Sequence, residues 1–382
     1  MNKIFIKSIF FVFFLTSISS NVLGQQKEYS LSELKAIEKN GSAIQTIEST
    51  ITRSKNGDSY HLMGTRRVLG GLNSLIKSKY DVKLINYQQE LINSIINSAK
   101  SSKSLKSSFN DNYLGWISKT KGNSYLQEAP LYEGYSFVYI AEFLYLLQKN
   151  GWKELNVENK KWWDKTLAFI EKNVWEKWIN RSEKRYGKKY TYFLRSQTHM
   201  GSHWAGIALY LEKISPNQSI GIQSKELYTS YDLLLKRNFQ NLNNGYVWNS
   251  TYDNVNGTDA IPTKSKRKQD TSHGNHVVSY ILAAYELGDK TWTKNDINLL
   301  VGTLKNSIYD RKSNSFRTYV NGADNKRDRS RFFLGDGWVK LGKYDSELVE
   351  IFNAFSLDND KMQVSNQEFQ FKSNLFYLKN LK

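Results

Sequence analysis

The histidines are the residues whose types and spacing could most directly perform chemistry. The 382-residue sequence has five, and four of them form two tight pairs, His199/His203 and His273/His276. On a helix, spacings of four and three residues place both imidazoles of a pair on one face. Tyr280 follows four residues after His276 and adds a phenol to the second face. This pattern predicts an acid–base site.

Three interpretations of the histidines stay open. They can be core or cap residues, with Asp270 or Ser272 capping a helix that begins near Gly274. They can bind a structural metal ion, although neither pair has the glutamate of a His-Glu-x-x-His arrangement. They can also catalyse β-elimination on a uronic acid. That reaction needs a group that neutralises the substrate carboxylate, a base, and an acid for the leaving oxygen.

Two segments hold a complete set of side chains for β-elimination. We expect Arg267, Asn275 or His199 to neutralise the carboxylate, and Tyr280 with His276 or His273 to transfer the protons. A tyrosine can act as base where cationic groups lower its pKa, and a basic run precedes this helix. The residues expected to contact the sugar are Arg195, His203, Trp204, Trp248, Tyr252, Glu133 and Tyr135.

Apolar residues recur at helical spacing along most of the chain, and alternating strand patterns are scarce. The predicted helices cover 64–78, 82–100, 131–149, 160–179, 199–214, 222–240, 274–288, 293–308 and 345–355. Very apolar and amphipathic helices alternate, which favours an all-α fold of helical hairpins, an (α/α) toroid or incomplete barrel. A long loop, 243–272, precedes the second histidine pair. The polar stretch after Leu357 predicts neither helix nor strand, and we expect it to form an appendage.

The first residues have the pattern of a signal peptide. Lys3 and Lys7 precede an apolar run that is too short to span a membrane, and a small residue, Gly24, follows. We therefore expect residues 1–24 to be removed and 25–382 to form one catalytic domain, secreted or periplasmic. The sequence has no cysteine, which excludes disulfides, lipid attachment through cysteine and thiolate metal sites.

Charge and aromatic content point to an acidic polysaccharide. The net charge is +18, and loss of two lysines with residues 1–24 leaves 18 − 2 = +16. Such an excess attracts polyanions. An exported protein meets acidic glycans more often than nucleic acid, and the 10 Trp and 24 Tyr can stack on sugars or pack the core. We expect a monomer without membrane insertion. No nucleotide-binding loop, nucleophile elbow or redox motif occurs, so no organic cofactor is expected.

The histidine segments resemble those of toroidal polysaccharide lyases. Segment 270–276, Asp-Thr-Ser-His-Gly-Asn-His, is similar to the Asp-x-Ser-x2-Gln-His element of chondroitin lyases. Segment 257–288 resembles the alginate-lyase segment that carries a catalytic Arg and Tyr. Segment 198–204 resembles their Asn-His helix, with Thr198 in place of Asn. The size, export signal and fold resemble family 38, the alginate and glucuronan lyases. This resemblance implies cleavage of such a polymer by β-elimination.

Two other functions stay open. A glycoside hydrolase on the same architecture needs two carboxylates that face each other across the sugar. Glu133, Asp253, Asp259 and Asp270 are available, but they form no signature. A non-catalytic glycan-binding protein needs basic and aromatic residues without an organised acid–base set. The clustering of the histidines argues against that function.

Overall fold

The computed structural model describes residues 29, 30, 33, 37, 43–121, 124–194, 197–251, 267–356 and 365–381. These residues are mostly helical, and the strands among them are two or three residues long. The prediction of an all-α protein is therefore confirmed. None of the described helices is apolar over enough of its length to cross a bilayer.

The α-helices are α3 (Ala43–Ser54), α4 (Ser59–Ser78), α5 (Val82–Asn97), α6 (Pro130–Lys149), α7 (Val157–Ile170), α8 (Lys177–Tyr186), α9 (Thr198–Ile214), α10 (Gln218–Asn238), α11 (Thr271–Glu286), α12 (Lys294–Gly302), α13 (Gly337–Lys340), α14 (Ser346–Ser356) and α15 (Ser365–Lys379). Wider π-helical turns at Glu171–Glu176 and Thr303–Ile308 extend α7 and α12. Antiparallel pairs are formed by β1 (Lys100–Ser101) with β2 (Leu114–Gly115), β3 (Gln240–Leu242) with β4 (Gly245–Val247), and β5 (Tyr309–Asp310) with β6 (Ser315–Phe316).

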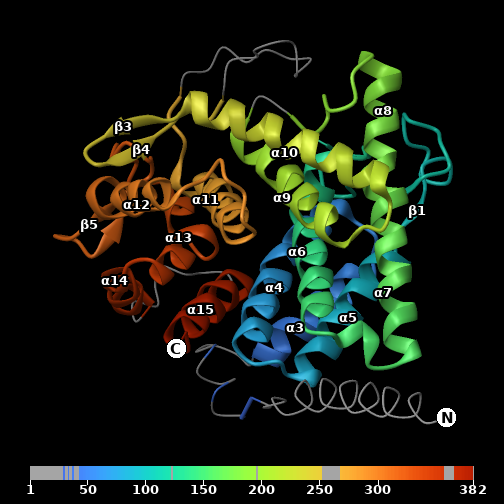
Figure 1. The fold of residues 1–382 in the computed structure, drawn as a ribbon, viewed down its shortest axis with the longest axis horizontal. Helices are drawn as coiled ribbons and strands as arrows, with labels where there is room; N and C mark the ends of the chain where they lie inside the picture. Colours follow the sequence, from blue (N-terminus) through green and yellow to red (C-terminus); the bar gives the residue numbers. More distant parts are fainter. Residues whose placement is uncertain are drawn as a thin grey trace, which may run out of the picture.

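Six helices contact one another in a closed order. Helix α4 packs on α6, α6 on α9, α9 on α11, α11 on α13, α13 on α15, and α15 on α4. Figure 1 shows these helices following one another around the middle of the view, with α10, α12, α14, α3, α5 and α7 outside them. The toroid stays a prediction, and this closed neighbour order is compatible with it.

Helix α15 corrects one expectation from the sequence. The stretch after Leu357 was expected to be an appendage without regular structure, yet α15 packs against both α4 and α13. Its inner face is polar as well as apolar, with Gln367, Gln370 and Asn374 buried beside Phe369. Because buried polar and apolar residues are interleaved along α15, the sequence shows no clear apolar stripe and hydrophobic periodicity does not reveal the helix.

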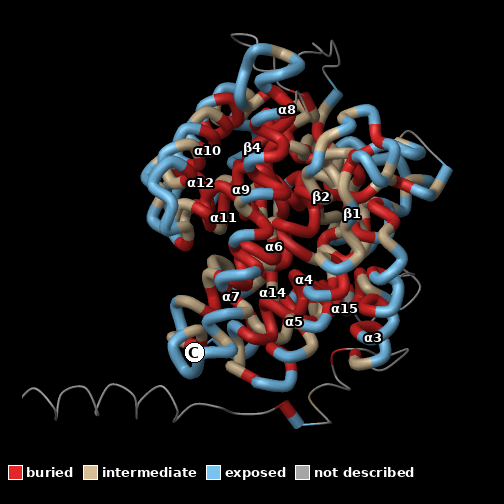
Figure 2. The backbone as a smooth tube through the Cα atoms, turned by 90° about the vertical axis from the view of Figure 1, so that its right-hand side faces the viewer, coloured by how far each residue is buried: buried red, intermediate tan, exposed pale blue. Residues whose placement is uncertain are grey.

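The same end of the inner helices faces one region. Between successive inner helices the chain returns once. It returns through α5 between α4 and α6, through α7 with α8 between α6 and α9, and through α10 between α9 and α11. The first turns of these four helices therefore lie together. Figure 2 shows that buried backbone gathers along α4, α6 and α9, whereas exposed backbone follows the outer surface. Side chains near the start of each inner helix can meet in the interior.

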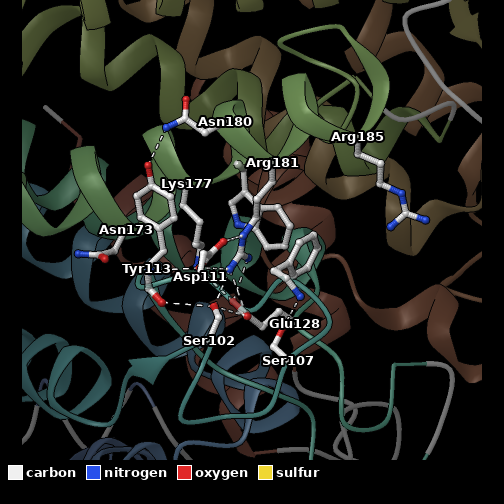
Figure 3. Close-up of polar contacts among 12 residues, drawn as sticks. Ser102, Ser107, Asp111, Tyr113, Glu128, Asn173, Lys177, Asn180, Arg181 and Arg185 are labelled. Atoms are coloured by element: carbon white, nitrogen blue, oxygen red, sulfur yellow. Dashed lines mark hydrogen bonds and ion pairs between the residues drawn. The ribbon is translucent and has the colours of Figure 1, made fainter.

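A buried ionic network fastens the segment between α5 and α6 to helix α8. Arg181 donates to Asp111 from Nε and Nη2, each at 2.9 Å, and from Nη1 to Glu128 at 3.0 Å. Lys177 Nζ lies 2.7 Å from Glu133 Oε1 and 3.8 Å from Glu128 Oε2. Figure 3 shows Arg181 between Asp111 and Glu128, with Ser102 beside them. Glu133, expected to contact sugar, is instead buried in this network.

Breaking the network should destabilise the fold strongly. Arg181→Met leaves Asp111 and Glu128 without their shared guanidinium, and losing one partner of a buried ion pair costs about 3–5 kcal/mol. Arg185→Met is the matched control, because Arg185 is exposed on the same helix and its described hydrogen bond reaches only Tyr192. Urea unfolding followed by tryptophan fluorescence measures both variants. Equal, small losses would contradict the structural role of Arg181.

Candidate active site

The two histidine pairs meet between α9 and α11. The ring centroids of His199 and His273 are 4.2 Å apart, and those of His203 and His276 are 4.6 Å apart. Each pair lies on one helix, as the spacing predicted, and each imidazole of α9 contacts one of α11. The chain therefore stacks two imidazole pairs along the interface of two inner helices.

Tyr135 joins these histidines from helix α6. Its ring centroid lies 4.2 Å from that of His203 and 5.2 Å from that of His276. The guanidinium carbon of Arg66, from α4, lies 4.2 Å from the Tyr135 ring centroid. We call Tyr135, His199, His203, His273 and His276 the histidine cluster. Four inner helices contribute to this site when Arg66 is included.

Asp270 holds His273 in one orientation. As the N-cap of α11, Asp270 Oδ1 accepts the backbone N–H of His273 at 2.9 Å, and His273 Nδ1 lies 2.9 Å from both carboxylate oxygens. Burial alone would raise the pKa of Asp270, but the hydrogen bonds from His273 outweigh it and the pKa is lowered. An ionised carboxylate can only accept, so Nδ1 carries a proton, and this pairing fixes the orientation of the imidazole ring. The side chain of His273 is 45% exposed, which suits a base that reaches substrate.

The three other imidazoles of the cluster are buried and uncharged. Burial, followed by neighbouring positive groups, lowers the pKa of His199, His203 and His276 well below 6.5. His199 Nδ1, His203 Nε2 and His276 Nδ1 have no hydrogen-bond partner among the described residues. Buried polar atoms without partners are rare in structural interiors, because each costs free energy. Three such atoms in adjoining imidazoles support a ligand site at the cluster.

One cavity reaches the histidine cluster, and another borders Arg66. A narrow cavity of about 60 Å³ runs between the inner helices from His203 and His276 toward Glu286, and a wider opening of about 1270 Å³ shares Glu286 with it. On the side of α4, a cavity of about 220 Å³ is bounded by Arg66 and residues of α3 and α4. No group of three or more metal-ligating side chains occurs among the residues that the structure describes.

The structure changes the role we assign to Tyr280. Its hydroxyl donates a 2.7 Å hydrogen bond to Asp232 Oδ1, which also accepts from Trp292 at 2.8 Å. Burial raises the pKa of Asp232 to about 7 and holds that of Tyr280 well above its usual value. Tyr280 therefore supports the packing of α11 on α10, and Tyr135 is the phenol in contact with the imidazoles.

Two tryptophans expected to contact sugar are core residues. Trp204 is 1% exposed and its ring lies 4.4 Å from that of Phe193; Trp248 is fully buried, 4.9 Å from the ring of Phe239. A side chain without exposed surface cannot form a sugar platform, so these two predictions are wrong for this structure. The count of 10 Trp and 24 Tyr left both uses of tryptophan open.

The remaining predicted residues have different positions. Asn275 is buried beside the cluster, and its Oδ1 accepts the backbone N–H of Trp338 at 3.1 Å. Arg267 is exposed and lies on the Tyr319 ring, 5.2 Å from its centroid. Arg195 and Tyr252 lie outside the described residues.

Sequence reasoning missed Arg66 and Arg67. Arg67 lies half-buried, 5.2 Å from the Phe333 ring centroid, and burial followed by the charge of Arg66 lowers its pKa to about 9. The sequence could have indicated them as site residues, because two consecutive arginines interrupt the apolar pattern of 64–78. Charges on an otherwise buried helix usually have a specific purpose.

No known family model, curated protein or solved structure matches this chain.

Neutral imidazoles predict a specific pH behaviour. His199, His203 and His276 should stay unprotonated at pH 6, because burial disfavours their charged form. The unfolded chain takes up protons near pH 6.5, so stability should be full above that pH and fall as the pH drops below it. Nitrogen-15 NMR of the imidazoles, assigned with single His→Gln variants, reports their ionisation. Protonation of all three at pH 6 in folded protein would show that the cluster is not neutral.

Proposed function

We propose that this protein is a polysaccharide lyase that cleaves an acidic polysaccharide, such as alginate or glucuronan, by β-elimination. The observation that supports it best is the contact of a phenol with neutral imidazoles beside an arginine that has no acidic partner among the described residues. Elimination needs these three kinds of group together.

The direction of the pKa shift of Tyr135 and the orientation of His273 suggest which residue is the acid and which is the base. Burial raises the pKa of Tyr135, so its phenol keeps its proton at neutral pH and suits the acid that protonates the leaving O4. His273, oriented by Asp270, presents a free Nε2 and suits the base that takes the C5 proton. The electrons of the broken C5–H bond form the C4=C5 double bond while the C4–O4 bond breaks. Arg66, with His199 or Asn275, supplies the positive or donor groups for the carboxylate.

The hydrolase alternative has less support. It requires two carboxylates available to the sugar. Glu133 is paired with Lys177, and Asp270 is bound to His273. Asp253 and Asp259 lie outside the described residues. We therefore retain hydrolysis, and glycan binding without catalysis, as outcomes of the experiment.

The proposal also covers the export, the oligomeric state and the cofactor requirement of the enzyme. We propose a monomer that is exported by residues 1–24, which lie outside the described residues, and that acts without an organic cofactor. Its positive charge favours an anionic polymer as the partner.

A matched pair of tyrosine variants tests the proposal. Wild-type protein is incubated with alginate, glucuronan, pectate, hyaluronan and chondroitin, and the ultraviolet absorbance of the unsaturated product is followed. Tyr135→Phe should lower the rate about 100-fold or more, since it removes the acid. Tyr280→Phe should keep most of the activity, because its hydroxyl bonds Asp232.

Each other outcome has a definite meaning. Reducing ends that accumulate without absorbance would establish hydrolysis, and the absence of both signals on every polymer would favour a binding protein. Activity that survives in Tyr135→Phe but is lost in Tyr280→Phe would overturn the assignment of the acid.

A further inference from the structure

A small recess beside the histidine cluster is lined by hydrogen-bond donors and aromatic rings. Its volume is about 20 Å³, and His276 borders both this recess and the cavity between the inner helices. The lining residues are Arg66, Arg67, Ser272, Asn275, His276, Phe332, Phe333, Gly335, Gln367, Gln370 and Phe371. No carboxylate occurs among them. The arginine and amide N–H groups of this lining can donate to an anion, and no carboxylate in the lining offsets the positive charge.

Two buried amides lack partners in this recess. Gln367 and Gln370, on successive turns of α15, are 7% and 6% exposed, and the Nε2 atom of each has no hydrogen-bond partner among the described residues. Asn275 adds a third donor, because its Oδ1 already accepts the Trp338 N–H and its Nδ2 is therefore the remaining polar atom. Buried donors without acceptors cost free energy unless a ligand or water supplies the acceptor.

The two arginines carry charge without an acidic partner. Arg66 Nη1 donates to the Met63 carbonyl at 2.9 Å and Arg67 Nη1 to Asn366 Oδ1 at 3.0 Å; both acceptors are neutral. No ion pair joins either arginine to an acid within the described part of the chain. Arg181, unlike Arg66 and Arg67, forms ion pairs with two carboxylates. Half-buried guanidinium groups without a counterion favour the binding of an anion.

We propose that this recess binds the carboxylate of the acidic sugar, with Arg66, Arg67 and the amides of Gln367, Gln370 and Asn275 as the donors. A carboxylate offers about four acceptor positions and matches the planar fork of arginine. The recess has room for the acidic group alone, and the cavity of about 220 Å³ bounded by the same two arginines has room for the sugar ring. The choice of a uronate over other anions rests on the proposed function, whereas the anion site itself does not.

Binding is measured without turnover. Isothermal titration and thermal shift compare D-glucuronate, D-glucose and sulfate on the purified full chain. Glucuronate should bind and raise the melting temperature, and glucose should not. Arg67→Met and Gln370→Leu should each weaken glucuronate binding about 10-fold or more, since each removes a donor to a charged group. Arg237→Met, an exposed arginine on α10, is the control and should bind as wild type does.

The stability of the ligand-free variant adds a second readout. Arg67→Met removes a half-buried, unpaired charge, so without ligand it should be at least as stable as wild type. A large loss of stability would show that Arg67 is a packing residue and would overturn the proposal. Glucuronate binding that is unchanged in Arg67→Met would overturn it as well.

The controls separate this proposal from the lyase. Sulfate that binds as tightly as glucuronate, with the same dependence on Arg67, would overturn the uronate assignment and point to sulfated glycans. A chain that fails to eliminate on any polymer but binds glucuronate through Arg67 would refute the lyase and keep the recess.

Discussion

The contact between α4 and α15 is the constraint on which the other features depend, because it joins segments 300 residues apart. Ser74 Oγ donates to Asn374 Oδ1 at 2.6 Å across this contact. Gly70 and Gly71 allow the close approach: an added Cβ would lie 2.8 Å from Gln370 Nε2 and 2.6 Å from the Phe369 ring. A larger residue at either position would push the helices apart. The same contact brings the glutamines of α15 beside the arginines of α4.

Buried polar groups fall into two kinds, and the difference separates scaffold from site. Arg181, Asp111 and Glu128 satisfy one another, so the network stabilises the fold and offers no group to a ligand. His203 and Gln370 are buried as deeply as Arg181 and Glu128, yet each keeps a polar atom without a partner among the described residues. Interiors pair their polar groups wherever they can. Unpaired atoms of His199, His203, His276, Gln367 and Gln370 belong to the cluster and the recess, and they support a ligand site there.

The assignment of the phenol shows the limit of helical spacing. His276 and Tyr280 share a face of α11, as their spacing of four predicts, but the two side chains meet different neighbours. Tyr280 is one turn further along and its hydroxyl reaches Asp232 of α10. Tyr135 of α6, which precedes His199 by 199 − 135 = 64 residues, has the contact that Tyr280 was expected to make. A shared face does not specify which neighbour that face meets.

The sequence by itself determined the all-α class, most helix positions and the placement of each histidine pair on one helical face. It also limited the cap of α11 to Asp270 or Ser272, and in the structure Asp270 is the cap of a helix that begins at Thr271. These properties depend on local periodicity and capping, which act within a few turns. Only the tertiary structure decided that the two pairs stack, that Trp248 is core, and that Arg67 lies beside Gln370. Those pairings depend on the packing of helices far apart in the chain, and a polar helix such as α15 carries no apolar stripe that reports its neighbours.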